Sequence, residues 1–203
     1  SDAQTLRNLS EIQPKEILKS TFKKAIDELT VTDKGTAEVK NYISLKLSKP
    51  KIAENQPFIV PKKSVFNKII GDNPFELEFA SFLESRFDDV VSYAKNTMGE
   101  GGINFKIEYQ AQDGNIREYY PDFFVKTNDK TFYIVETKGR EDLDDIRKIQ
   151  RLFVWCKDIN TAQKDYTYSP VYIKQEKWDD IKNNFKSFAE VVKIFTVTEN
   201  KES

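Results

Sequence analysis

Apolar residues follow two different spacings along this chain, and the changes in spacing mark the expected elements. Over Glu118–Lys126 and again over Thr131–Thr137, β-branched and aromatic residues form two short runs that are typical of strands. The residues between them, 127–130, are turn formers. We therefore predict an antiparallel hairpin over 118–137, and the rest of the chain is organised around it.

Helical spacing of apolar residues predicts a helix on each side of this hairpin. The first covers Pro74–Val91 and begins with Asn73 as its N-cap. The second follows an acidic segment, 141–145, which suits the positive N-terminal end of a helix dipole, and its apolar face covers 146–156. The same spacing predicts two more helices, at 14–29 and 176–189.

Three further strands are expected outside the hairpin. Alternation predicts a strand over 104–110, and Asp113-Gly114 forms a tight turn that joins it to the hairpin in a three-stranded meander. Apolar runs predict strands at 168–173 and 191–197. The expected fold class is therefore α/β, with a mixed sheet of about five strands flanked by helices and an N-terminal helical or irregular extension.

Charged residues gather at the open end of the predicted hairpin. Depending on the length of the turn, Asp122 lies opposite Val135 or Glu136, where Cβ atoms are about 5 Å apart. Lys138 points to the same face as Glu136, because side chains alternate along a strand. Two carboxylates this close repel each other unless a cation lies between them, and Mg²⁺ suits such oxygen ligands. The Thr137 side chain points away, but its backbone carbonyl can reach the metal.

This arrangement has both a chemical and a structural interpretation. A metal ion lowers the pKa of a bound water, and the Lys138 ammonium assists its deprotonation or stabilises charge that develops on a phosphate. In the structural alternative, Asp122 caps a strand, and Glu136 and Lys138 form a surface ion pair that contributes little to stability.

Glu76, in the first predicted helix, falls inside the apolar stripe. A carboxylate on the buried side of a helix needs a partner. It can complete a capping box with Asn73, or it can face the metal site as a further acid, and the two interpretations are compatible.

The second helix carries a basic stripe beside the acidic cluster. Arg147, Lys148 and Arg151 are spaced so that they can contact the phosphates of a DNA backbone. The alternative is a solvated helix face, paired with Asp144 and Asp145 at i,i+3 and i,i+4 spacing.

Composition narrows the classes of function. One Cys and no His exclude a zinc finger and every His-dependent catalytic scheme, and Cys156 is expected in the core. The net charge of −1 gives no global basic signal for nucleic acid, so DNA binding requires a local patch and bound metal. No apolar run approaches the roughly 20 residues that span a membrane, so we expect no membrane partner. The single Cys indicates a reducing, cytoplasmic setting.

The hairpin residues resemble a known signature. Pro121-Asp122, followed by Glu136-Thr137-Lys138, resembles the PD-(D/E)xK nuclease motif. The longer context is similar to the C-terminal nuclease domain of the restriction (Res) subunit of type III restriction–modification enzymes, and its residues are 75–80, 120–124 and 136–139. The resemblance implies a restriction-endonuclease-like (PD-(D/E)xK) core over 64–203. It also implies that 1–63 is an extension, or a linker from an upstream motor domain.

For activity, the resemblance implies a Mg²⁺-dependent endonuclease that acts on double-stranded DNA, with Mn²⁺ as a possible substitute. Asp122, Glu136 and the Thr137 carbonyl would hold one ion, and Glu76 could help to hold a second. Lys138 would be catalytic. The implied partners are a methyltransferase (modification) subunit and an ATP-driven motor, both outside this chain, with ATP needed only by the motor. The alternatives are a catalytically silent nuclease-like module that binds DNA or a partner, and a DNA repair nuclease.

Overall fold

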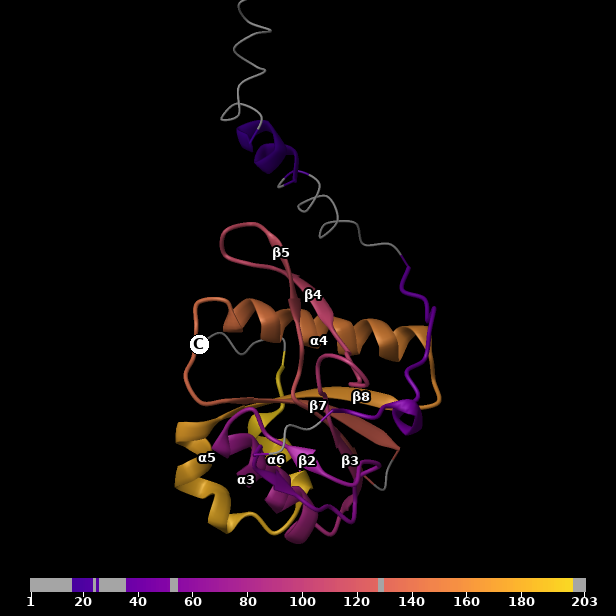
Figure 1. Cartoon of the computed structure of the whole chain (residues 1–203), viewed down its shortest axis with the longest axis vertical. Helices are drawn as coiled ribbons and strands as arrows, with labels where there is room; N and C mark the ends of the chain where they lie inside the picture. The colour runs from indigo at the N-terminus through magenta and orange to yellow at the C-terminus, as the bar shows by residue number, and fades with distance from the viewer. Residues whose placement is uncertain (1–15, 24, 26–35, 52–54, 128–129, 199–203) are drawn as a thin grey trace, which may run out of the picture.

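The computed structural model describes residues 16–23, 25, 36–51, 55–127 and 130–198. Its centre is a four-stranded mixed sheet with the strand order β3-β6-β7-β8 (Figure 1). Strand β6 is antiparallel to both β3 and β7, whereas β7 and β8 are parallel. The strands are β3 (Val90–Lys95), β6 (Phe123–Thr127), β7 (Thr131–Lys138) and β8 (Thr167–Lys174).

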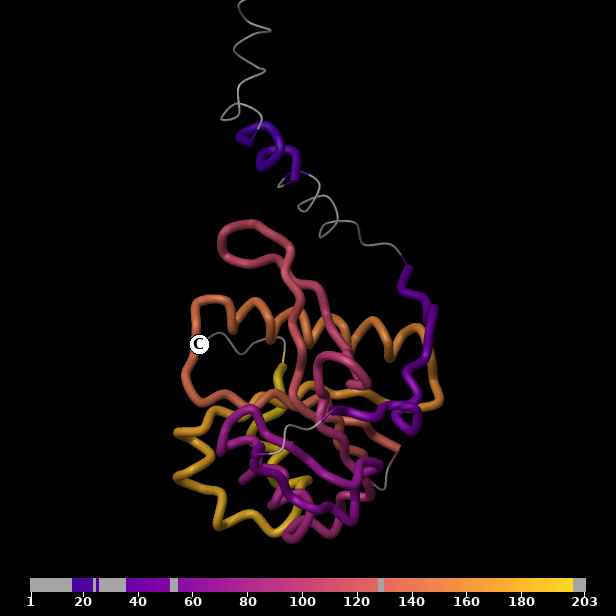
Figure 2. Tube along the Cα trace, viewed as in Figure 1, coloured from indigo at the N-terminus to yellow at the C-terminus, as the bar shows by residue number. Residues whose placement is uncertain are grey.

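Helices cover both faces of this sheet (Figure 1). One face carries α3 (Pro74–Ser85), α5 (Gln175–Ile181) and α6 (Phe188–Phe195), and the other carries α4 (Asp145–Ala162). A separate hairpin of β4 (Ile107–Gln110) and β5 (Ile116–Tyr119) extends away from the sheet on the α4 side (Figure 2). The remaining described elements are short: η1 (Leu45–Leu47), β1 (Phe58–Ile59), β2 (Ile69–Ile70) and η2 (Lys182–Asn184).

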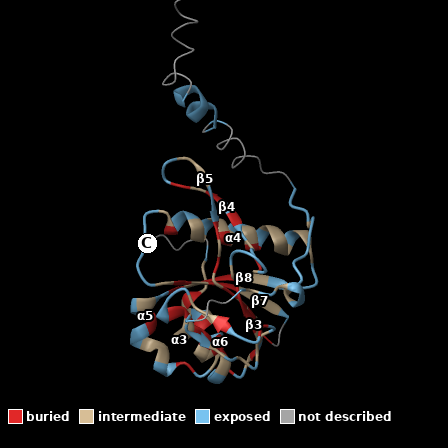
Figure 3. Ribbon diagram, viewed as in Figure 1, coloured by how far each residue is buried: buried red, intermediate tan, exposed pale blue. Residues whose placement is uncertain are grey.

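Side-chain alternation divides the core into two clusters, one on each face of the sheet (Figure 3). Val135 in β7 is fully buried in the cluster formed with α3, α5 and α6, where Trp178 is also fully buried. The next residue toward the turn, Ile134, is buried in the other cluster with Leu152 and Cys156 of α4. The prediction that Cys156 is a core residue is therefore confirmed.

The predicted hairpin over 118–137 is present as β6 and β7, but its first strand is shorter. Strand β6 begins at Phe123, after Pro121, which has no N–H to donate to a sheet. Residues 116–119 form β5, which pairs with β4 and with no other described strand, so the predicted meander of three strands is wrong. Of the predicted turn, residues 128–129 lie outside the described residues.

The helix predicted over Pro74–Val91 begins as expected and ends early. Asn73 caps it, with its side chain accepting from the Glu76 N–H, and the helix ends at Ser85. The segment Val90–Lys95 is strand β3 instead, paired with β6. Its β-branched and aromatic residues favour a strand, and sheet pairing outweighs the continuing apolar stripe.

The C-terminal part of the described chain also differs from the prediction. The helix predicted over 176–189 stops at Ile181, and the strand predicted at 191–197 is helix α6. Ser187 caps α6 by accepting from the Glu190 N–H, and its buried residues recur at helical spacing. The central sheet thus has four strands rather than about five, whereas the strand predicted at 168–173 is confirmed as β8.

Of the helix predicted at 14–29, residues 16–23 and 25 are helical and exposed, and the others lie outside the described residues. The domain boundary between residues 63 and 64 stays a prediction. Strands β1 and β2 pair residues from its two sides, and the Tyr93 N–H donates to the Lys63 carbonyl. Among the described residues, no helix combines the length and the apolar character that crossing a bilayer requires.

Candidate functional site

The charged residues of the hairpin lie at the end of the sheet where β6 begins and where β3 and β7 end. Asp122 directly precedes β6, and its N–H donates to the Val135 carbonyl at 3.0 Å. Strand β7 ends with Glu136, Thr137 and Lys138. Phe123 pairs with Val135, and continuing this register by one residue places Asp122 opposite Glu136. This is one of the two predicted registers.

A cleft of about 500 Å³ opens at this end of the sheet. It brings together five residues that the sequence singled out as metal-binding or catalytic: Glu76, Asp122, Glu136, Thr137 and Lys138. The rest of its lining comes from the start of α3, the loop after β7 and the start of α5: Asn73, Pro74, Phe75, Gly139, Arg140 and Gln175.

The Asp122 carboxylate is held by two groups of Thr137 and by a lysine. Its Oδ2 accepts from the Thr137 N–H at 2.8 Å and from the Thr137 hydroxyl at 2.6 Å. Its Oδ1 lies 3.3 Å from Lys95 Nζ. Alternation places the Thr137 side chain on the opposite face from Glu136. The Thr137 side chain was expected to point away from the site. It does point away from Glu136, but its hydroxyl contacts Asp122.

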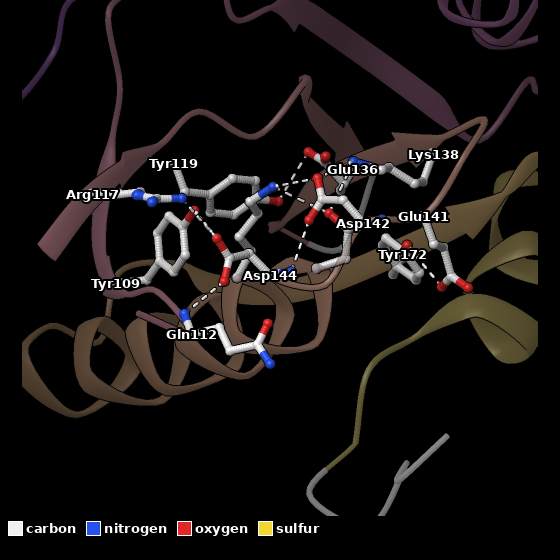
Figure 4. A network of polar contacts seen from close by, with 12 residues as sticks. Tyr109, Gln112, Arg117, Tyr119, Glu136, Lys138, Glu141, Asp142, Asp144 and Tyr172 are labelled. Atoms are coloured by element: carbon white, nitrogen blue, oxygen red, sulfur yellow. Dashed lines mark hydrogen bonds and ion pairs between the residues drawn. The ribbon is translucent and has the colours of Figure 1, made fainter. Parts of the chain in front are cut away.

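Glu136 is held from the other side of the sheet. Its Oε2 accepts from the Tyr119 hydroxyl at 2.9 Å (Figure 4). Burial raises the pKa of Glu136 well above its usual value, and the charge of Asp122 adds to this, against the opposing effects of Tyr119, Lys138 and Lys95. A cation bound at both carboxylates would relieve this repulsion, which is the electrostatic condition for a metal site.

Lys138 lines the same cleft, but its ammonium is bound to acids beyond β7. Its Nζ lies 2.9 Å from Asp145 Oδ1 and 3.2 Å from Asp142 Oδ2. Lys148 Nζ contacts the same two acids at 3.2 and 3.0 Å. Burial lowers the pKa of Lys138, but Asp145 and Asp142 outweigh this effect and the net shift is upward, so the ammonium stays charged.

The predicted DNA-binding residues lie on α4, outside the lining of the cleft. Lys148 pairs with Asp145 at i,i+3, as in the structural alternative. Arg151 donates from Nε to the Glu108 carbonyl at 3.2 Å, and Arg147 is exposed. Their contact with DNA stays a prediction.

Glu76 has a capping role and also faces the cleft. It is 4% exposed, and its Oε1 accepts from Asn73 Nδ2 at 2.8 Å. Its Oε2 accepts from the Asp72 N–H at 2.8 Å and lies 3.0 Å from Lys95 Nζ. Burial raises the pKa of Glu76, the charge of Asp122 raises it further, and Lys95 opposes both effects. Its two predicted roles remain compatible.

Lys95 is the residue of this site that the sequence analysis missed. It is the last residue of β3 and is 2% exposed, although it carries a charge. Burial lowers the pKa of Lys95, but Asp122, Glu76 and Asp72 outweigh this effect and the net shift is upward. A lysine at the end of a largely apolar strand was the available signal, and it was missed because Val90 and Val91 were assigned to the preceding helix and residues 92–97 to no element.

The donor set fits a hard divalent cation such as Mg²⁺ or Mn²⁺. Asp122, Glu136 and the Thr137 carbonyl, all at the cleft, offer oxygen only, and Mg²⁺ commonly takes one or two carboxylates together with water and phosphate. In the part of the chain that the structure describes, no group of three or more acidic, His or Cys side chains is arranged around a common metal position. A pair of carboxylates suits an ion that completes its shell with substrate and water.

Comparison with protein families gives one finding. A family model described as "TnsA-like endonuclease N terminal" matches residues 88–190, just over half of the 203 residues. The matched stretch contains Lys95, Asp122, Glu136 and Lys138, whereas Glu76 precedes it. Neither the curated proteins nor the solved structures that were compared include a match to this chain.

Proposed function

Since the chain belongs to the TnsA-like N-terminal endonuclease family, we propose that it hydrolyses phosphodiester bonds of double-stranded DNA in a metal-dependent reaction at the cleft. One observation carries the proposal. Asp122, Glu136 and Lys138 line one cleft, and the charge of Asp122 raises the pKa of Glu136. These are the residues that resemble the PD-(D/E)xK motif in sequence, and their shared cleft supports the proposal.

We assign the metal-binding role to Asp122, Glu136 and the Thr137 carbonyl, with Mg²⁺ as the natural ion and Mn²⁺ as a substitute. When bound, the ion neutralises charge on the scissile phosphate and lowers the pKa of water. The protein fixes the two carboxylates from opposite sides: Thr137 orients Asp122 with two hydrogen bonds, and Tyr119 orients Glu136 with one. Such preorganisation reduces the reorganisation needed at the moment of reaction.

Lys138 supplies positive charge beside the reacting phosphate. Its ammonium is shared between Asp145, which is buried, and Asp142, which is exposed. A phosphate oxygen that enters the cleft competes with Asp142 for this ammonium, while Asp145 keeps the lysine in place. Lys138 then positions the attacking water or stabilises the charge that develops on the phosphate.

DNA would lie along the N-terminal half of α4. Arg147, Lys148 and Arg151 all belong to this half, and Lys148 shares Asp142 and Asp145 with the catalytic lysine. Contacts from these residues to phosphates would set the orientation of the duplex without reading its sequence.

The resemblance to the Res nuclease domain supports one setting for this activity. In that setting the chain is the cleavage part of a cytoplasmic type III restriction enzyme. An ATP-driven motor precedes it, and a modification subunit reads the sequence. A DNA repair nuclease and a silent nuclease-like module remain the alternatives. The presence of both carboxylates and the lysine in one cleft favours an enzyme over the silent module.

The test is cleavage of supercoiled plasmid with Mg²⁺, with EDTA and with Ca²⁺ in place of Mg²⁺. We expect nicking by the wild type and by Lys186→Ala, which removes an exposed lysine, but not by Lys138→Ala. Nicking that persists in EDTA, or in all site variants, would contradict the proposal. If the wild type does not nick, calorimetric titration with Mn²⁺ separates a competent site that needs partners from a silent module that binds no metal.

A further inference from the structure

The Lys95 ammonium lies among three carboxylates, two of which, Glu76 and Asp122, line the cleft. Its Nζ is 3.0 Å from Glu76 Oε2, 3.3 Å from Asp122 Oδ1 and 3.3 Å from Asp72 Oδ2. Glu76 and Lys95 are both buried, whereas the Asp72 side chain is 65% exposed. Lys95 therefore bridges Glu76 of α3 and Asp122, which precedes β6, from the buried side.

The lysine is fixed in this position by its strand. Lys95 pairs with Phe123 in the register of β3 and β6, and its Nζ lies 5.4 Å from the centroid of the Phe123 ring. Phe123 directly follows Asp122, so the ammonium is placed next to Asp122 by the sheet itself. A buried lysine with charged partners is costly to move, because its ammonium would leave these carboxylates without a counter-charge.

A second metal ion held by Glu76 would need the space that this ammonium fills. Mg²⁺ binds its oxygen ligands at about 2.0–2.1 Å, so an ion bridging Glu76 and Asp122 would lie between the oxygens that Lys95 now contacts. We propose that Lys95 takes the place of a second metal ion, so that the active site binds a single divalent cation through Asp122 and Glu136. This inference rests on the function proposed above.

The charge balance of the cleft supports a single ion. The acids that line the cleft are Glu76, Asp122 and Glu136. Asp72, which contacts Lys95, adds a fourth negative charge, and Arg140 in the lining adds a positive charge to that of Lys95. Four negative and two positive charges leave two negative charges, which one divalent cation balances. Lys138 does not enter this balance, because its charge is matched by Asp142 and Asp145.

The test counts the ions bound, which does not depend on cleavage. Mn²⁺ binding is measured by calorimetry and by electron paramagnetic resonance on the whole chain. We expect one Mn²⁺ per molecule for the wild type and two for Lys95→Met, because the vacated position between Glu76 and Asp122 then accepts a cation. The additional ion should be lost in the double variant Lys95→Met/Glu76→Gln. As a matched control, Lys63→Met removes another partly buried lysine, whose Nζ donates to carbonyls of Leu83 and Phe87, and it should still bind one ion.

Each outcome decides the proposal. Two ions in the wild type, or one in folded Lys95→Met, overturn it and leave the proposed function intact. If Lys95→Met does not fold, the number of ions bound by the wild type is combined with the Mn²⁺ affinities of two other variants. We expect Glu76→Gln to weaken Mn²⁺ binding less than about threefold and Asp122→Asn to weaken it more than about tenfold. A loss in Glu76→Gln as large as that in Asp122→Asn overturns the proposal. A wild type that binds no Mn²⁺ overturns the proposed function as well.

Discussion

The Tyr119 hydroxyl donates a 2.9 Å hydrogen bond to Glu136 Oε2 and so connects the β4–β5 hairpin to the carboxylate at the end of β7. Tyr119 is buried at the last position of β5. Burial raises the pKa of Tyr119 well above its usual value, and the charge of Glu136 adds to this, so the phenol remains a donor at every physiological pH. The hairpin outside the central sheet thus contributes a group that orients a proposed metal ligand.

Tyr119→Phe tests this relationship. The variant keeps the ring in the core and removes only the hydroxyl, so we expect the free energy of unfolding to fall by about 1 kcal/mol. Mn²⁺ affinity and the rate of plasmid nicking should each fall by roughly 10-fold or more, because Glu136 loses the partner that orients it. Tyr120→Phe, which removes an exposed hydroxyl bound to Glu118, is the control. Equal effects of the two variants would contradict an orienting role for Tyr119.

Glu136→Gln should separate stability from activity. The substitution keeps the shape of the side chain and removes a negative charge opposed to Asp122, so in metal-free buffer we expect an unchanged or higher Tm. Nicking should fall by more than about 100-fold, because the amide is a poor ligand for Mg²⁺. Glu108→Gln, on the exposed face of β4, should alter neither. A Glu136→Gln variant that nicks at the wild-type rate would remove Glu136 from the site.

Arg147 and Arg151 are predicted to contact DNA phosphates. The double variant Arg147→Ala/Arg151→Ala should weaken duplex binding equally for unrelated sequences. It should also lower the slope of log K against log [salt] by about 1 for each lost phosphate contact. Fluorescence anisotropy from 50 to 200 mM salt would measure both effects. Lys193→Ala, an exposed lysine of α6, serves as the control, and a loss confined to one sequence would contradict backbone contact.

Asp142 should make stability depend on acid pH. Burial raises the pKa of Asp142, but hydrogen bonds from Lys148, from the Asp144 N–H and from Lys138 outweigh this, and the net shift is well below the usual value. Because the folded pKa is depressed, the stabilisation is complete above the pKa of an unfolded Asp, about 4, and is lost as the pH falls below it. Asp142→Asn should therefore show a smaller fall in Tm than the wild type between about pH 5 and pH 2. Parallel curves would contradict this linkage.

The central part of the site could be predicted from the sequence because its signals are local. Asp122 and Glu136 belong to one hairpin, so the strand period and the turn between the strands narrowed the residue opposite Asp122 to Val135 or Glu136, and the pairing of Phe123 with Val135 is consistent with Glu136. The start of α3 was equally local, since Asn73, Pro74 and Glu76 form a cap within a few residues.

The missed features depend on contacts between distant segments. Val90 continues the apolar stripe of α3, and only pairing with β6, more than thirty positions later, makes its segment a strand. The position of Lys95 beside Asp122 follows from that pairing and could not be predicted without it. The opposite error, a helix predicted as a strand, occurred around Val191. Its β-branched residues favour a strand by propensity, but burial of Phe188 and Phe195 on one face of α6 stabilises a helix.

The mixed pairing of β7 has a consequence for the order in which the protein folds. Only residues 128–130 separate β6 from β7, whereas β8 follows β7 only after the 18-residue helix α4, and the β4–β5 hairpin lies between β3 and β6. Loops that are short close at lower entropic cost, so we expect the β6–β7 pair to form first. Asp122 and Glu136 then meet before Lys95 arrives to balance them. Early folding therefore works against like-charge repulsion, and divalent cations in the refolding buffer should accelerate it.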